Sequence, residues 1–408
     1  MEILFDIDES LKETQAEIFR DNSRFKVVAA GRRYGKSYLA TFILLTEAFK
    51  KVGNYYFIAN TYSQARTILW EILKDKTRDK LASKINGQRL EVTLINGSVI
   101  SLKGGDRAET LRGISLSGVV FDEFASVRNP EETWTRVIRP ALSDQKGFAL
   151  FISSPSGRNY FYTLYNEAKT KAGWESWQRT TIDGGYVDDE EIASAKHDLD
   201  ERSFKQEYLG SFESFEGLVC PEYDRKLNDS KEVILEDDIL IFGVDYNINV
   251  MGTVVFVKRG IELHALDVFF GSFDTVALME AIEHRYPTHK KIFHTDATGA
   301  SRKTSAGGAT DVKIIESYGY RVLNLRKNPG IIDRVNATNS MICSADGSRR
   351  VFIHASLKRM IETLERHVFN DDGMPDKKSG YDHLYDGFSY ALWHYSKLGS
   401  TSISTRRR

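Results

Sequence analysis

The chain has 408 residues, a length typical of two domains, and its 41% hydrophobic content is sufficient for packed cores. Its two cysteines, Cys220 and Cys343, are too few and too far apart for a disulfide scaffold or a cysteine-rich zinc site. The net charge of −1 neither favours nor excludes nucleic acid, and the lack of a signal peptide or of an apolar run of roughly 20 residues predicts no membrane association.

A strand, a turn of small residues and a helix are the first predicted elements, within residues 25–49. The apolar run 25–30 predicts a buried strand, and the turn after it ends in Gly35-Lys36-Ser37. This layout is typical of a P-loop, in which backbone N–H groups and a helix N-terminus surround a polyphosphate. Lys36 is expected to reach the β- and γ-phosphates of ATP, and Ser37 to ligate Mg²⁺. Nucleotide hydrolysis is therefore the first functional hypothesis.

The loop departs from the usual pattern at its first position. Ala30 stands where glycine is usual, Gly31 follows it, and two arginines come next. An ordinary surface turn is the alternative, and the flanking strand and helix disfavour it. The residues expected to bind the nucleotide here are Ala30, Gly31, Arg32, Arg33, Tyr34, Gly35, Lys36 and Ser37.

Two further strands are predicted to contribute polar side chains to the same site. The apolar run 117–121 ends on Asp122 and Glu123. Asp122 is expected to hold Mg²⁺, and Glu123 to orient and deprotonate the attacking water. The run 148–152 leads into Ser153-Ser154-Pro155, where the small hydroxyl residues, Ser153 first among them, are expected to sense the γ-phosphate. A solvated strand end is the alternative interpretation of the acidic pair.

The strand-like runs of residues 1–212 alternate with helical patterns, which predicts a parallel sheet with helices on both faces. Asn96-Gly97 joins two short runs, 89–95 and 99–103, and is typical of a hairpin. The irregular, acidic stretch 213–238 is interpreted as a linker. The strands of the parallel sheet are expected at 25–30, 55–60, 117–121 and 148–152.

A second α/β domain is predicted over residues 239–398, ahead of a basic tail at 399–408. Three strands in a meander, a helix and a fourth strand are typical of the ribonuclease-H-like order. The strands are expected at 239–244, 252–258, 261–270 and 291–295, and the helix at 275–284. In this fold the first strand, the fourth strand and a late helix bring carboxylates together, here Asp245, Asp296 and Asp386.

Clustered carboxylates are suited to phosphodiester cleavage with two Mg²⁺ or Mn²⁺ ions. The alternative is that each aspartate only ends a strand or caps a helix. Asp382, one helical turn before the third aspartate, is either an auxiliary ligand or an N-cap. His294 and His383 lie beside the acidic positions and could contact metal or phosphate, but a structural or solvated histidine is favoured at both.

Together, the Ala30–Ser37 loop, the Asp122-Glu123 pair and the Ser153-Ser154-Pro155 strand end resemble the ATPase of viral large terminase subunits. These are the motors that package DNA into bacteriophage heads. Three further segments match the family: Leu11-x-x-x-Gln15-x-x-x-Phe19, like an adenine-reading Q motif, Leu111-Arg-Gly-Ile114, and Phe204-x-x-Glu207-Tyr-Leu209.

The resemblance implies a fold, partners and residue roles. The chain would translocate double-stranded DNA into a procapsid with ATP and Mg²⁺, and would cut concatemeric DNA with a metal-dependent nuclease domain. Arg32 would contact the phosphates in cis, and Arg112 would act on the neighbouring subunit's nucleotide. Asp386 matches the family's helix position, although Gly387 replaces the more usual alanine.

The implied partners are the portal protein and the small terminase subunit. The chain would be a monomer in solution and a homo-oligomeric ring on the portal, in the cytoplasm of the infected bacterial host and absent from the mature virion. Two alternatives stay open: a repair-type helicase-nuclease, and a nucleotide-gated DNA-binding assembly factor with an inactive nuclease domain.

Overall fold

The computed structural model describes residues 11–77, 81–106, 111, 113–157, 159–213, 216–246, 250–300, 310–324 and 327–396. The chain divides into two compact units. Unit 1 comprises Met1–Ile192 and Lys205–Ser214, and unit 2 comprises Ala193–Phe204 and Phe215–Arg408. Each unit is built on its own sheet.

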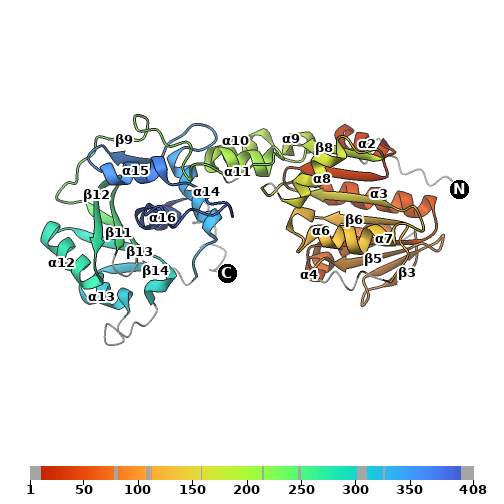
Figure 1. The fold of residues 1–408 in the computed structure, drawn as a ribbon, viewed down its shortest axis with the longest axis horizontal. Helices are drawn as coiled ribbons and strands as arrows, with labels where there is room; N and C mark the ends of the chain where they lie inside the picture. Colours follow the sequence, from red (N-terminus) through yellow and green to blue (C-terminus); the bar gives the residue numbers. More distant parts are fainter. Residues whose placement is uncertain are drawn as a thin grey trace. The chain divides into compact units, whose positions relative to one another are not determined.

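Unit 1 contains an eight-stranded sheet in the order β3-β4-β5-β2-β6-β7-β1-β8 (Figure 1). The strands from β5 to β8 in this order pair in parallel, and β3, β4 and β5 form an antiparallel edge. The predicted strands and hairpin are confirmed, whereas the polar edge strands β3 and β8 were not predicted. The strands are β1 (Phe25–Ala30), β2 (Asn54–Ala59), β3 (Ala82–Asn86), β4 (Glu91–Leu94), β5 (Val99–Gly104), β6 (Gly118–Asp122), β7 (Phe148–Ser153) and β8 (Trp174–Arg179).

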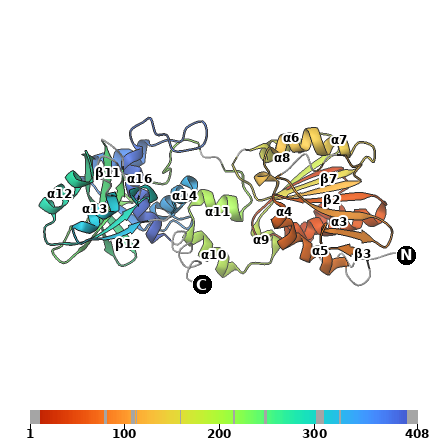
Figure 2. The same ribbon diagram turned by 90° about the horizontal axis from the view of Figure 1, so that it is seen from below.

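Helices cover both faces of this sheet (Figure 2). On β1, Val28 packs in the core with α3, and Val27 packs in the opposite core with α8, so alternate side chains of one strand are buried on opposite faces. Two π-helices, Ala65–Leu69 and Thr133–Ile138, and a 3₁₀ turn, Phe124–Ser126, complete the unit. The helices are α2 (Glu13–Arg20), α3 (Lys36–Lys50), α4 (Tyr62–Gln64), α5 (Trp70–Thr77), α6 (Pro130–Glu132), α7 (Arg139–Ala141), α8 (Tyr160–Ala168), α9 (Thr181–Gly184), α10 (Asp189–Asp198) and α11 (Glu201–Tyr208).

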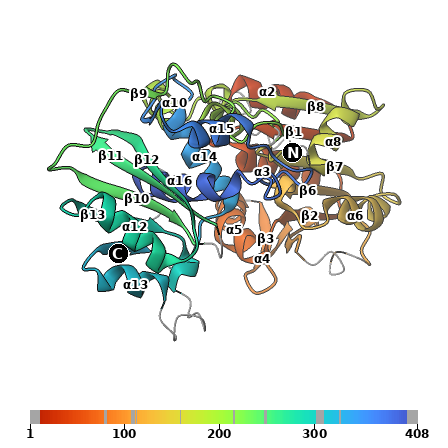
Figure 3. The ribbon, with the colours of Figure 1, turned by 60° about the vertical axis from the view of Figure 1, so that its left-hand side comes forward.

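Unit 2 contains a seven-stranded sheet in the order β14-β13-β10-β11-β12-β15-β9. Strands β10, β11 and β12 are antiparallel, and β13 lies parallel to β10, which is the ribonuclease-H-like arrangement predicted from the sequence. Figure 3 shows the meander between helices on its two faces. The strands are β9 (Asp229–Ser230), β10 (Ile239–Asp245), β11 (Met251–Arg259), β12 (Glu262–Ser272), β13 (Lys290–Thr295), β14 (Arg321–Asn324) and β15 (Val351–His354).

Helix α16 (Asp382–Tyr395) packs closely on the meander. Glycines lie on both sides of the contact: Gly387 on the helix, and Gly243 and Gly252 on β10 and β11. A Cβ on Gly387 would lie 2.5 Å from the carbonyl oxygen of Gly252 and 2.9 Å from that of Gly243. This close approach explains the glycine where alanine was expected. The other helices are α12 (Thr275–Arg285), α13 (Asp311–Ser317), α14 (Ile331–Ile342) and α15 (Lys358–Arg366), with a 3₁₀ turn at Ala297–Ala300.

The division between the units differs from the predicted linker at 213–238. Strand β9, within that stretch, pairs with β15 of the second sheet, and residues 193–204 also group with unit 2. Helices α10 and α11 therefore each contribute residues to both units. The basic tail, 399–408, lies outside the described residues. Among the described helices, none has the length and apolar character needed to cross a membrane.

Candidate functional site

The P-loop connects the buried end of β1 to the first turn of α3. Gly35 has φ +91° and Arg33 has φ +62°, so the loop makes two left-handed turns before the helix begins. Gly31 is required for a different reason, because a Cβ there would lie 2.5 Å from the carbonyl oxygen of Tyr208. The glycine therefore stands where α11 closely approaches the loop.

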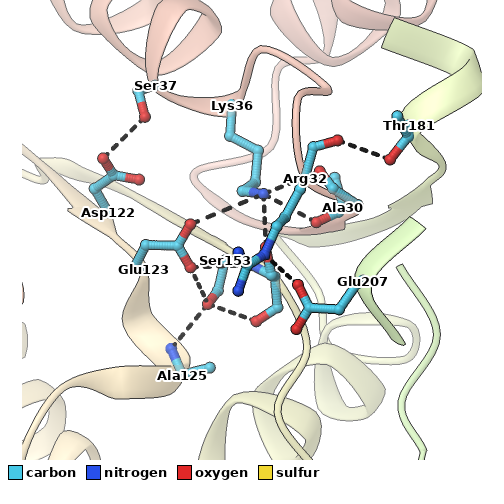
Figure 4. A network of polar contacts seen from close by, with 12 residues as sticks. Ala30, Arg32, Lys36, Ser37, Asp122, Glu123, Ala125, Ser153, Thr181 and Glu207 are labelled. Carbon is cyan, nitrogen blue, oxygen red and sulfur yellow. Dashed lines mark hydrogen bonds and ion pairs between the residues drawn. The ribbon is translucent and has the colours of Figure 1, made fainter. Parts of the chain in front are cut away.

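Lys36 lies at the centre of a polar network (Figure 4). Its Nζ donates to the carbonyl oxygens of Ala30 and Gly31, at 3.0 and 3.1 Å, and to Oγ of Ser154, at 2.9 Å. It also forms an ion pair of 3.9 Å with Glu123. Burial lowers the pKa of Lys36, and the carboxylates of Glu123 and Asp122 oppose this shift. Ser154 belongs to the strand end whose small hydroxyl residues are predicted to sense the γ-phosphate, next to Ser153.

Asp122 and Ser37 face each other across the site from β6 and α3. Oγ of Ser37 donates to Oδ2 of Asp122 at 2.9 Å. The other carboxylate oxygen, Oδ1, is buried and has no hydrogen-bond partner among the described residues. Burial, together with the neighbouring Glu123, raises the pKa of Asp122 to about 6. A hydroxyl beside a carboxylate with one unused oxygen is a donor set that suits Mg²⁺.

Glu123 follows directly and has φ +51°, an uncommon conformation for a residue with a side chain. Its Oε2 accepts hydrogen bonds from Oγ of Ser153, at 3.1 Å, and from the backbone N–H of Ser154, at 3.2 Å. The strand ends of β6 and β7 therefore fix this carboxylate 3.9 Å from Lys36. Backbone strain held by surrounding contacts is common at functional sites.

Arg32 is bound to Glu207, a residue that sequence reasoning did not assign to the site. Its Nε forms an ion pair with Oε2 of Glu207, and its backbone N–H donates to the carbonyl oxygen of the same residue at 2.7 Å. Oγ1 of Thr181 donates to the carbonyl oxygen of Arg32 at 2.7 Å. The P-loop is thus held to α9 and α11 by both backbone and side-chain contacts.

A cavity of about 730 Å³ opens over this network. It is within the size range typical of small-molecule sites. The predicted residues that line it are Arg32, Arg33, Gly35, Lys36, Ser37, Asp122 and Glu123, joined by Tyr38, Asn60, Gln64, Ser154, Gln206 and Glu207.

Other predicted nucleotide-binding residues are not in the lining of this cavity. Gln15 is fully buried, and its Nε2 donates to the carbonyl oxygen of Tyr34 at 2.8 Å. The amide therefore stabilises the backbone of the P-loop. Tyr34 is also fully buried. Arg112 lies outside the described residues. The assignment of Gln15 to adenine remains a prediction.

The acidic residues of unit 2 come from β10, the end of β13 and α16. Burial, followed by the nearby Asp386, raises the pKa of Asp245 to about 7, with a further contribution from Asp296. Asp386 and Asp296 therefore lie close enough to Asp245 for their charges to act on it, as expected for a site that a cation would stabilise. Asp296 accepts hydrogen bonds from Oγ1 of Thr298, at 2.6 Å, and from the N–H of Gly299, at 3.3 Å.

Two neighbours on α16 complete this acidic site. Nδ1 of His383 lies 3.3 Å from Oδ2 of Asp245 and 3.9 Å from Asp382. Asp382 is buried, and its Oδ1 has no hydrogen-bond partner among the described residues. His294 lies apart, buried against the ring of His394. Within the described part of the chain, no three His, Cys, Asp or Glu side chains are already arranged around a metal position, so the metal ligands remain predictions.

The chain combines a unit that contains a P-loop with a ribonuclease-H-like unit. Residues 27–216 match a family model described as the N-terminal part of the terminase large subunit of T4-like viruses. The chain is 23% identical over 401 residues to the large terminase subunit of Escherichia phage T5, covering 92% of this chain and 87% of that protein. It is 27% identical over 287 residues to the large terminase subunit of Thermus virus P23-45, covering 58% of this chain and 57% of that protein.

A similar fold is found among solved structures. The large terminase of the thermophilic bacteriophage D6E superposes with a TM-score of 0.59 at 14% identity, over 94% of this chain and 98% of that chain. The D6E protein has also been solved with ADP and with ATP-gamma-S. The chain is thus similar to the bacteriophage large terminase subunits, the family that its motifs resemble.

Proposed function

We propose that the chain is a DNA-packaging motor that hydrolyses ATP in unit 1 and cuts DNA in unit 2. The observation that carries the first half is the network around Lys36. Its ammonium binds two carbonyl oxygens of its own loop and Oγ of Ser154, inside a cavity of about 730 Å³. These contacts would be exchanged for phosphate oxygens of ATP, and the N-terminus of α3 would bind the same phosphates.

Ser37 and Asp122 would hold Mg²⁺, which supplies charge neutralisation of the phosphates. The unpartnered Oδ1 of Asp122 and its hydrogen bond to Ser37 support this assignment. Glu123, held by Ser153 and Ser154, would orient the attacking water and accept its proton. Arg32 would contact the phosphates after its release from Glu207.

The nuclease assignment is supported by the place of Asp245 at the end of β10, where the charges of Asp386 and Asp296 act on it. Closely spaced carboxylates bind hard divalent cations through oxygen. Two Mg²⁺ or Mn²⁺ ions would activate the attacking water and stabilise the leaving oxygen. Double-stranded DNA would be bound through its backbone, with little sequence preference in the cut itself.

The packaging role implies a ring. Heterologous interfaces that close form a ring, and each subunit can then offer an arginine to its neighbour's γ-phosphate. Arg112 is our candidate for the trans contact. Mixing Arg112→Ala subunits with Lys36→Ala subunits should restore part of the ATPase activity, because each supplies what the other lacks. No recovery at any ratio would remove the trans assignment. The ring would form on the portal protein, with the small subunit delivering DNA, in the cytoplasm of the infected bacterial host.

The test is ATP-dependent protection of duplex DNA from added nuclease, with portal-bearing procapsids from the same virus. Protection that requires ATP and fails with Glu123→Gln supports the packaging motor. A repair-type helicase-nuclease would instead displace a labelled strand from a partial duplex. An assembly factor with an inactive nuclease would leave plasmid DNA uncut in Mn²⁺.

A further inference from the structure

A buried arginine contacts one of the proposed metal ligands. Arg334, on α14, is 6% exposed, although arginine is rarely buried without a specific partner. Its Nη2 forms an ion pair of 2.7 Å with Oδ1 of Asp386, and its Nη1 donates to Oγ of Ser389 at 2.8 Å. The guanidinium also lies 4.1 Å from the ring centre of Tyr390.

These contacts fix the guanidinium from several directions. Ser389 in turn donates to the carbonyl oxygen of Asp386 at 3.0 Å, so the arginine of α14 joins a network with a serine and an aspartate from one turn of α16. Gly387, next to Asp386, packs against Gly243 and Gly252, and this contact sets the distance between this turn of α16 and the sheet. The carboxylate of Asp386 is therefore oriented both by its backbone and by its side-chain partner.

The orientation matters because Asp386 is one of the proposed metal ligands, and one of its two carboxylate oxygens is already engaged by the guanidinium. With Oδ1 occupied by Arg334, a carboxylate has one oxygen left for a cation. Hydrogen bonds of this kind orient metal-binding carboxylates, and their loss typically lowers metal affinity 10–100-fold.

We propose that Arg334 is a positioning residue of the nuclease site: it holds Asp386 through Oδ1, so that Oδ2 is the oxygen that binds a divalent cation. This inference rests on the proposed nuclease function. Lysine cannot replace arginine in this role, because a single ammonium cannot reproduce the planar fork that reaches Asp386 and Ser389 and stacks on Tyr390. If the ion pair only held α14 against α16, replacing Arg334 in a folded variant would leave the cation affinity at Asp386 unchanged.

The test is direct Mn²⁺ binding to the full chain without nucleotide, measured by the EPR signal of free Mn²⁺. The Asp386-dependent part of the binding is the difference between wild type and Asp386→Asn. Arg334→Lys and Arg334→Gln should weaken that part about 10–100-fold. Neither should have a further effect when combined with Asp386→Asn, because the arginine acts through this aspartate.

Arg350→Lys is the matched control. Arg350 is also buried in unit 2, at 7% exposure, and its Nη2 donates to the carbonyl oxygen of Ser340 at 2.8 Å. It should leave Mn²⁺ binding unchanged. Thermal melting identifies variants that do not fold. Ser389→Ala is a milder change, because it removes only one hydrogen-bond partner of the guanidinium, and it should lower the Mn²⁺ affinity less than the Arg334 variants do.

The outcomes separate the inference from the function on which it rests. Equal Mn²⁺ binding by wild type and Asp386→Asn would overturn the proposed metal site, and the inference with it. Loss of binding in Asp386→Asn with wild-type affinity in every folded Arg334 and Ser389 variant would overturn the inference alone.

Discussion

Oγ of Ser37 donates a hydrogen bond of 2.9 Å to Oδ2 of Asp122, which joins the first turn of α3 to the end of β6. Asp122→Asn should therefore abolish the strengthening of ATP binding by Mg²⁺, because it removes the charge while keeping the side chain's size. A fluorescent ATP analogue titrated with and without Mg²⁺ measures this effect. Asp144→Asn, at an exposed position of the same unit, is the control and should behave as wild type.

Gly31→Ala should destabilise unit 1 and weaken ATP binding. The new Cβ would lie 2.5 Å from the carbonyl oxygen of Tyr208 and 2.7 Å from Oγ1 of Thr181, so the loop or α11 must move. Overpacking of this kind costs about 1–3 kcal/mol. Gly87→Ala is the matched control, since nothing lies within 4 Å of its Cβ position. Equal melting temperatures and ATP affinities for the two variants would contradict the interpretation that close packing requires glycine at position 31.

Glu207→Gln should tighten ATP binding. The ion pair between Glu207 and Arg32 competes with the phosphates for the guanidinium, and the Arg32 side chain is 70% exposed. Exposed ion pairs are worth up to about 1 kcal/mol, which corresponds to at most about a fivefold change in affinity. Isothermal titration with ATP-gamma-S, with the exposed Glu175→Gln as control, measures the change. Weaker binding would show that Glu207 supports the loop rather than restraining Arg32.

Asp245→Asn, Asp296→Asn and Asp386→Asn should each stop DNA cleavage and leave ATP hydrolysis largely unchanged. Each change removes a negative charge from the acidic site of unit 2 but keeps the size of the side chain. Asp382→Asn should have a milder effect. Plasmid nicking in Mn²⁺, abolished by a chelator in the wild type, is the measurement. Robust cutting by purified Asp245→Asn protein would rule out the metal-cluster assignment.

The sequence predicted the parts of the fold and site that depend on local patterns. The P-loop, the Asp122-Glu123 pair and the meander whose first strand ends in Asp245 each occupy a continuous stretch, where residue type and periodicity carry the information. Strands β14 and β15 have four residues each, too few to show a period. They were not predicted for this reason.

The missed site residues depend on partners far away in the chain. Glu207 was noted only as part of a family segment, and its contact with Arg32 exists only after α11 packs against the loop. Arg334 lies in an ordinary helical pattern, and nothing near it in the sequence indicates Asp386 as its partner. The burial of Gln15 beneath Tyr34 likewise follows from packing and not from its motif.

The most direct test of the ATPase that drives the proposed motor is a comparison of ATP binding and ATP turnover in Glu123→Gln. Lys36, Ser37 and Asp122 bind the nucleotide and its metal in our account, and Glu123 acts on the water alone. Turnover should fall by about 10²–10⁴-fold, the usual contribution of a general base, while ATP affinity changes little. Hydrolysis at the wild-type rate with normal ATP binding would contradict the account.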